Sequence, residues 1–154
     1  MKKVFLFALL ALMGVTVLFT SCDNEEVEAG PVPEATVIGK VKAELNTTNS
    51  ELEFAPVGTK IYFRIKSQQL TMDPLPNYNY QTLQYETTVD ANGEYNIKLP
   101  CATHQAVNVT IVPVNFRLDK VTSDTTSVDY YYNGVQDSVA IRNGEMHYKD
   151  LQYN

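Results

Sequence analysis

The sequence predicts an all-β protein, an antiparallel β-sandwich of about seven strands. The composition favours strands and turns over helices, because the 154 residues include ten Tyr, seven Gly and seven Pro. Short segments of alternating apolar and polar residues recur along the chain, separated by turn-forming residues. No stretch has a convincing helical period, and the chain has no internal repeat. Its length suits one domain with a sizeable core, which we place at residues 35–154.

The first residues predict an exported protein. Two lysines and a long uncharged, mostly apolar run lead to Cys22, which is typical of a secretory signal peptide over residues 1–21. The alternative is an uncleaved anchor, because the run is about long enough to span a bilayer. The residues Thr20, Ser21 and Cys22, with Phe19 where leucine is usual, resemble the lipobox of bacterial lipoproteins in its relaxed Bacteroidetes form. That resemblance implies that Cys22 is diacylated and becomes the mature N-terminus.

The charge of the chain argues against a polyanionic partner. Its 12 basic and 18 acidic residues give a formal charge of −6. Loss of residues 1–21 would remove two lysines and no acid, so that 10 bases against 18 acids leave −8. Phosphate backbones and anionic headgroups repel such a domain. We therefore expect no nucleic-acid partner, and membrane attachment only through acyl chains on Cys22.

The segment after Cys22 bears on location. Residues 22–34 are acidic, contain Pro and Gly and have almost nothing to bury, so they predict a flexible tether. The acids directly after Cys22 also resemble the signal that sends some Bacteroidetes lipoproteins to the cell surface. This implies a lipid anchor in the outer membrane and a domain facing outward. An ordinary acidic linker and a periplasmic domain are the alternative.

Seven segments carry the strand pattern. Gly39 in the first strand predicts a bulge or a close neighbour. Two turn sequences each predict a hairpin. The first is the four residues from Asp90 to Gly93, and the second is the pair Asn143 and Gly144, which would suit a type I′ turn. Segment 107–114 is apolar on both faces in its second half, which indicates a central strand. The seven predicted strands are 37–45, 59–65, 83–89, 95–99, 107–114, 137–142 and 145–153.

Two polar stretches separate these strands. Residues 66–81 form a loop of a length that is usually functional or disordered. The Ser- and Thr-rich stretch 119–129 receives no strand.

Three motifs stand out within about residues 36–114. Their residues are Val37, Gly39 and Val41; Pro56, Gly58 and Ile61; and Asp90, Asn92, Gly93, Tyr95, Ile97, Leu99 and Pro100. Together these motifs resemble the transthyretin-like domains related to the carboxypeptidase regulatory domain. The chain departs from that pattern at Glu86, where the third motif usually opens with Thr. The resemblance implies a seven-stranded, prealbumin-like sandwich that serves as a non-catalytic module.

No catalytic residue, metal ligand or cofactor site is predicted. Cys101 and His104 are three apart, so in extended chain they point to opposite faces, and a partly buried Cys at a strand end is the better interpretation. The oxygens of Asp90 and Asn92 are too few for a calcium loop and suit a turn. The chain has two His in all, which argues against an enzyme.

Tyrosines in or beside the polar stretches are the candidate contacts to a ligand or partner, because a tyrosine offers rigid contact area with a polar tip. The alternative is that they cover the edges of the sandwich. These candidates are Tyr78, Tyr80, Tyr130, Tyr131 and Tyr132. Thr125 and Ser138 each follow an Asp and resemble the O-glycosylation sites of Bacteroidetes, although the residue after Thr125 is not aliphatic.

Two hypotheses for function follow. The first is a lipid-anchored envelope or cell-surface β-sandwich that binds an envelope protein or acts as a structural spacer, without catalysis. The alternative is an accessory glycan-binding lipoprotein of a carbohydrate-acquisition system that captures sugars on exposed Tyr residues.

Overall fold

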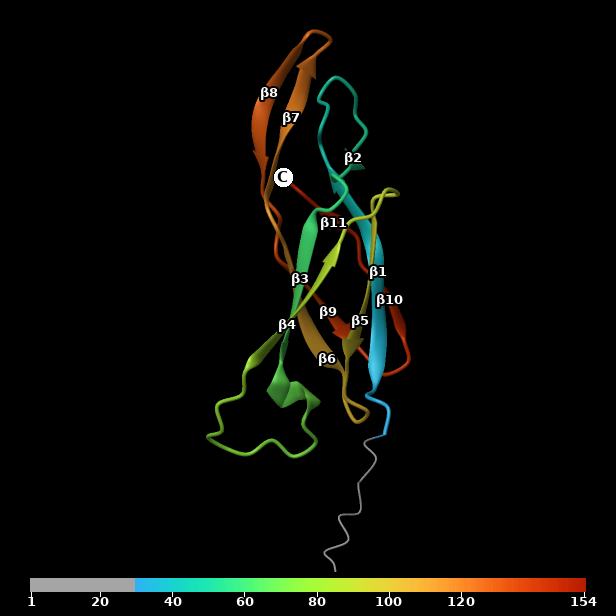
Figure 1. The fold of residues 1–154 in the computed structure, drawn as a ribbon, viewed down its shortest axis with the longest axis vertical. Helices are drawn as coiled ribbons and strands as arrows, with labels where there is room; N and C mark the ends of the chain where they lie inside the picture. The colour runs from blue at the N-terminus through green and yellow to red at the C-terminus, as the bar shows by residue number, and fades with distance from the viewer. Residues whose placement is uncertain (1–29) are drawn as a thin grey trace, which may run out of the picture. The chain divides into compact units, whose positions relative to one another are not determined.

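The computed structural model of the chain describes residues 30–154, so the predicted signal peptide, Cys22 and most of the tether lie outside the described residues. The described part is all-β, as the sequence predicts (Figure 1). Eleven strands replace the predicted seven, because residues 53–54, 116–123 and 126–132 form additional strands and the predicted strand 145–153 divides into two. They are β1 (Glu34–Ala43), β2 (Glu53–Phe54), β3 (Lys60–Lys66), β4 (Thr82–Thr88), β5 (Glu94–Pro100), β6 (Val107–Pro113), β7 (Phe116–Ser123), β8 (Thr126–Tyr132), β9 (Asp137–Ile141), β10 (Met146–Tyr148) and β11 (Leu151–Gln152).

A short 3₁₀ helix, η1 (Ser67–Leu70), follows β3. Within residues 30–154 the structure contains no helix that is long and apolar enough to cross a membrane.

Strand β1 is the centre of the first sheet. On one side it pairs antiparallel with β5 and, near its C-terminal end, with β2. On the other side it pairs parallel first with β10 and then with β11. The sheet is therefore mixed rather than wholly antiparallel. Ala35, Val37 and Val41 alternate with more exposed residues, which gives β1 one buried face.

The second sheet has the strand order β4-β3-β6-β9, and every pair in it is antiparallel. Strand β6 lies between β3 and β9, so the predicted central strand is confirmed. The buried faces of the two sheets share one hydrophobic core. Across it, the rings of Phe63 on β3 and Tyr95 on β5 have their centroids 5.7 Å apart. The domain is thus the sandwich that the alternating segments predict.

The predicted hairpin around Asp90 is wrong in its pairing. Strand β4 pairs with β3 and strand β5 with β1, so the two arms belong to different sheets. The turn itself forms, because Oδ1 of Asp90 accepts the backbone N–H groups of Asn92 and Glu94, both at 2.8 Å. Alternation shows only which face of a strand is buried. Here each arm pairs over seven residues with a third strand instead of with the other arm, β4 with β3 and β5 with β1.

The second predicted hairpin is wrong for the same reason. Strand β9 pairs with β6 in the second sheet, and β10 pairs with β1 in the first. Between them Gly144 has a φ of 74°, whereas Asn143 is not in the positive-φ region. A type I′ turn requires positive φ at both central residues. The connection is instead a link between the two sheets.

An additional ribbon occupies the stretch to which no strand was assigned. Strands β7 and β8 pair with each other, with a register shift between Val121 and Ser123. Most of their residues are exposed, so the ribbon lacks the apolar alternation that marks a half-buried strand. An aromatic cluster holds its base, because the ring of Phe116 stacks on Tyr132 and meets the edge of Tyr153, each at 4.8 Å.

The close neighbour predicted for Gly39 is confirmed. A Cβ atom at this position would collide with the backbone carbonyl of Lys149, in the connection between β10 and β11. The ring of Tyr95, directly across from Gly39 on β5, reaches the same carbonyl, and its hydroxyl donates a hydrogen bond to the oxygen at 2.6 Å. The missing side chain at Gly39 therefore allows this connection to approach β1.

The substitution Gly39→Ala should lower the free energy of unfolding by roughly 3 kcal/mol, since the new methyl group meets backbone that has little freedom to move. Urea unfolding followed by circular dichroism would measure the loss. Gly30→Ala is the matched control, because nothing lies within 4 Å of its added Cβ. Equal midpoints for the two variants would show that the approach at Gly39 is not tight.

Candidate functional site

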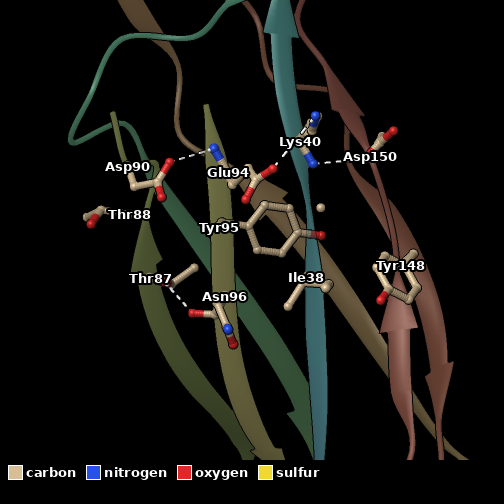
Figure 2. A pocket seen from close by; sticks show the side chains of 11 residues that line it. Ile38, Lys40, Thr87, Thr88, Asp90, Glu94, Tyr95, Asn96, Tyr148 and Asp150 are labelled. Carbon is tan, nitrogen blue, oxygen red and sulfur yellow. Dashed lines mark hydrogen bonds and ion pairs between the residues drawn. The ribbon is translucent and has the colours of Figure 1, made fainter. Parts of the chain in front are cut away.

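A groove of about 790 Å³ crosses the outer face of β1 and β5 and also reaches Gly39 and Tyr95, which occupy inward-facing positions of these strands (Figure 2). It extends from the end of β4 to the connection between β10 and β11. Its lining consists of Ile38, Gly39, Lys40, Thr87, Thr88, Asp90, Glu94, Tyr95, Asn96, Tyr148 and Asp150.

One row of groove residues is largely apolar. Ile38 is in register with Asn96 of β5 on one side and with Tyr148 of β10 on the other, so the three residues lie side by side across three strands. Side chains of directly opposite residues in neighbouring strands emerge on the same face. Ile38 is half-buried, whereas Tyr148 is 76% exposed and stands at one edge of the groove.

The neighbouring row is ionic. Lys40 is in register with Glu94, and Nζ of Lys40 lies 3.7 Å from the Glu94 carboxylate. The carboxylate of Asp150 accepts the backbone N–H of Lys40 at 2.8 Å, which holds Asp150 on the other side of β1. Both partners of the ion pair are about half exposed, so the pair contributes little to stability. A polar ligand can therefore compete for these side chains at small cost.

The two rows together suit a ligand with one apolar face and a polar rim. Small-molecule sites commonly combine an apolar surface with a few convergent polar groups. Tyr148 and Ile38 provide apolar area, and Asn96, Glu94 and Asp150 provide donors and acceptors beside it. Among the described residues lining the groove there is no His or Cys, and Asp90 already accepts two N–H groups of its turn.

The candidate tyrosines of the β3–β4 loop lie away from the groove. Tyr78 is 62% exposed, and its ring meets the edge of Tyr80 at 4.7 Å. The hydroxyl of Tyr80 accepts the backbone N–H of Leu75 at 2.7 Å, so this ring organises the loop. Figure 1 places the loop and the β7–β8 ribbon at opposite ends of the described domain. The five candidate tyrosines therefore form no single surface.

The tyrosines of β8 have separate environments. Tyr132 is 1% exposed, stacks on Phe116 and donates a hydrogen bond to the carbonyl oxygen of Glu44 at 3.2 Å. Contact between Tyr132 and a ligand does not fit this burial, because its ring belongs to the base of the ribbon. Tyr130 and Tyr131 are exposed on opposite faces of the ribbon, as alternation along a strand requires.

Cations accompany both exposed rings of β8. Nζ of Lys120 lies 4.7 Å from the ring centroid of Tyr130, and the guanidinium of Arg117 lies 5.8 Å from that of Tyr131. Lys120 also bonds to the Glu44 carboxylate at 2.6 Å, which links the ribbon to the segment after β1.

The candidate glycosylation residues are both accessible. Thr125 lies in the turn that joins β7 to β8, and Ser138 points outward from β9. Their modification stays a prediction.

Tyr148 and Asn96 were not among the candidates from the sequence. They belong to predicted strands that are far apart along the chain, and only the pairing of β5 and β10 with β1 brings them to Ile38. The sequence offered one signal for Tyr148 as a groove residue, a tyrosine on the outward face of a strand. Every exposed strand tyrosine gives that same signal, so it could not single out Tyr148.

Comparisons with known proteins identify no family. No protein-family profile matches the chain, and no curated protein matches it. Among solved structures, the chain is similar to a "putative carbohydrate binding protein" from Pseudomonas aeruginosa. The two are 13% identical with a TM-score of 0.47, and the match covers 79% of this chain and 89% of the other. A likeness at this level assigns neither family nor ligand.

Cys101 and His104 have different surroundings. Cys101 is 4% exposed directly after β5, and burial, with a smaller contribution from the charge of Glu34, raises the pKa of its thiol. His104 is exposed in the connection to β6. Within residues 30–154, no three His, Cys, Asp or Glu side chains are grouped closely enough to hold a metal ion.

The native protein should therefore leave Cys101 unmodified by iodoacetamide at neutral pH, because the thiolate is disfavoured and the sulfur is buried. Intact-mass measurement after short exposure would test this, with the urea-unfolded chain as the reactive control. Rapid alkylation of the folded protein would point instead to an accessible, activated thiol.

Proposed function

We propose that the chain is a lipid-anchored lipoprotein of the bacterial envelope whose β-sandwich binds carbohydrate in the groove beside Tyr148, without catalysis. Acyl chains on Cys22 would hold it in the outer membrane, with the domain on the cell surface. The resemblance of its motifs to transthyretin-like modules supports a non-catalytic role.

The paired rows in the groove carry this proposal. One face of a sugar ring presents C–H groups, which pack against an aromatic ring such as that of Tyr148. The rim of the same ring presents hydroxyls, which can donate to Glu94 and Asp150 and exchange hydrogen bonds with Asn96. The net negative charge of the ionic row favours a neutral ligand rich in donors over an anionic one.

A second candidate function, binding of an envelope protein, is favoured by the β7–β8 ribbon. The ribbon exposes apolar side chains on a two-stranded element, and Leu118, Val128 and Tyr130 are each about two-fifths exposed. Within the described residues, β8 pairs along its length only with β7. A free edge of this kind can accept a strand from another protein.

The anchor is tested by Cys22→Ser, which should move the protein from the membrane fraction to the soluble fraction, since acyl chains would no longer hold it. Cys101→Ser is the matched control, because it removes the other cysteine and should leave the protein membrane-bound. Protease treatment of intact cells would then separate a surface location from a periplasmic one. Retention of the Cys22→Ser protein in the membrane would overturn the lipid anchor.

Binding in the groove is tested by Tyr148→Ala. A glycan array would first identify the sugars that the native protein retains, and titration would then compare variants. Loss of the Tyr148 ring should weaken binding roughly tenfold, or about 1.4 kcal/mol, the upper end for one aromatic contact. Stability should change by less than about 0.5 kcal/mol, because the side chain is 76% exposed.

Tyr78→Ala is the matched control for this measurement, since Tyr78 is also strongly exposed but lies in the β3–β4 loop. Its affinity should equal that of the native protein. A native protein that retains no glycan, or equal affinities for Tyr148→Ala and the native chain, would reject the groove as a sugar site.

A further inference from the structure

The longest connection between described strands exposes three large apolar side chains. It joins β3 to β4, and within it Met72, Leu75 and Tyr78 are 68%, 65% and 62% exposed. Asp73 is the only charged residue in the whole connection, 67–81. Exposed apolar groups collected on one loop of a small domain usually mark a surface that something covers.

Local interactions hold these side chains outward. Asn77 has a φ of 65° after Pro76, and the N–H of Tyr78 points back to the carbonyl of Leu75 at 3.5 Å, which is typical of a type II turn. The hydroxyl of Tyr80 accepts the N–H of Leu75 at 2.7 Å. Backbone hydrogen bonds within the loop thus fix its shape, and Leu70 packs against the core, whereas Met72, Leu75 and Tyr78 do not.

The loop lies at the end of the domain where the chain enters β1. The side-chain amide of Gln105, in the β5–β6 connection, donates to the carbonyl of Gln69 in η1 at 2.9 Å. At the start of the same connection, the N–H of Cys101 donates to the carbonyl of Pro33 at 2.9 Å, just before β1. Figure 1 shows the start of β1 and the β3–β4 loop at the same end, opposite the ribbon.

The proposed anchor lies close along the chain to this end. Eleven residues lead from Cys22 to Pro33. Fully extended they reach at most about 40 Å, and as the flexible chain that their composition predicts they span roughly 18 Å. A lipid anchor at Cys22 would therefore keep this end near the bilayer and raise the effective concentration of the loop at its surface.

The chemistry of the loop suits that position. Leu and Met partition into the boundary between headgroups and acyl chains, and Tyr is favoured at the level of the headgroups. The mature chain has a formal charge of −8 and is repelled by anionic headgroups, so a loop with a single acid is suited to approach them. The groove is distant from the loop along the strands. Lys40 lies further along β1, and Asp90 follows the end of β4 that is opposite the loop.

We propose that the loop 71–81 is a second membrane contact, which seats Met72, Leu75 and Tyr78 in the interface of the bilayer that holds Cys22. This inference rests on the proposed lipid anchor but not on the proposed sugar site. The contact would orient the domain, with the groove and the ribbon directed away from the lipid.

Tryptophan fluorescence tests the contact, because the chain contains no Trp. The full acylated protein carrying Leu75→Trp would be reconstituted into phosphatidylcholine–phosphatidylethanolamine vesicles that contain brominated phosphatidylcholine. Its emission should shift to the blue, and most of it should be quenched by bromine placed at the depth of about 5–10 Å where interfacial segments bury apolar groups.

Val57→Trp is the matched control. Val57 is 69% exposed and precedes β3, at the end of that strand opposite the loop, so its Trp should stay unquenched. If the two variants show the same emission wavelength and the same bromine quenching on vesicles to which the protein is bound, the membrane contact is overturned and the anchor stands. Failure of both to float with vesicles, with no acyl mass on Cys22, would reject the anchor and the contact together.

Discussion

The approach of the Lys149 carbonyl to Gly39 determines how the first sheet is assembled. At this point the chain between β10 and β11 passes close to β1, and the Tyr95 hydroxyl bonds to the same carbonyl from across the strand. The residues on either side of Lys149 are consequently brought beside β1, Tyr148 next to Ile38 and Asp150 next to Lys40. The groove is thus a product of the contact that completes the sheet, and a side chain at Gly39 would disturb both.

The two turns that resemble hairpin turns have a different role in the sandwich. Each carries the chain from one sheet to the other, from β4 to β5 and from β9 to β10. The Asp90 carboxylate stabilises the first of them by accepting two N–H groups, so that the sheets are joined by a well-bonded link. This link lies beside the groove, so hydrogen bonds of the turn hold the backbone at the polar end of the groove in place.

The features outside the core divide between the ends of the domain. The β3–β4 loop and the entry of the chain share one end, and the β7–β8 ribbon extends at the other. In the proposed arrangement the first end meets the lipid, and the groove and ribbon remain open to ligands and partners. The ribbon needs its aromatic base for this, since a two-stranded element alone is marginally stable, and Phe116, Tyr132 and Tyr153 join it to the core.

Alternation in single segments was enough to predict an all-β sandwich and the central position of β6, and the glycine within β1 indicated a bulge or a close neighbour at Gly39. These features depend on local pattern, because side chains two apart share a face and a glycine within a strand leaves room for backbone. The pairing of β4 with β3, of β10 with β1, and the burial of Tyr132 were decided only by the tertiary structure. Strand pairing depends on which distant apolar faces can be buried together. For that reason the row of Asn96, Ile38 and Tyr148, a candidate site, exists only once three distant segments are folded side by side.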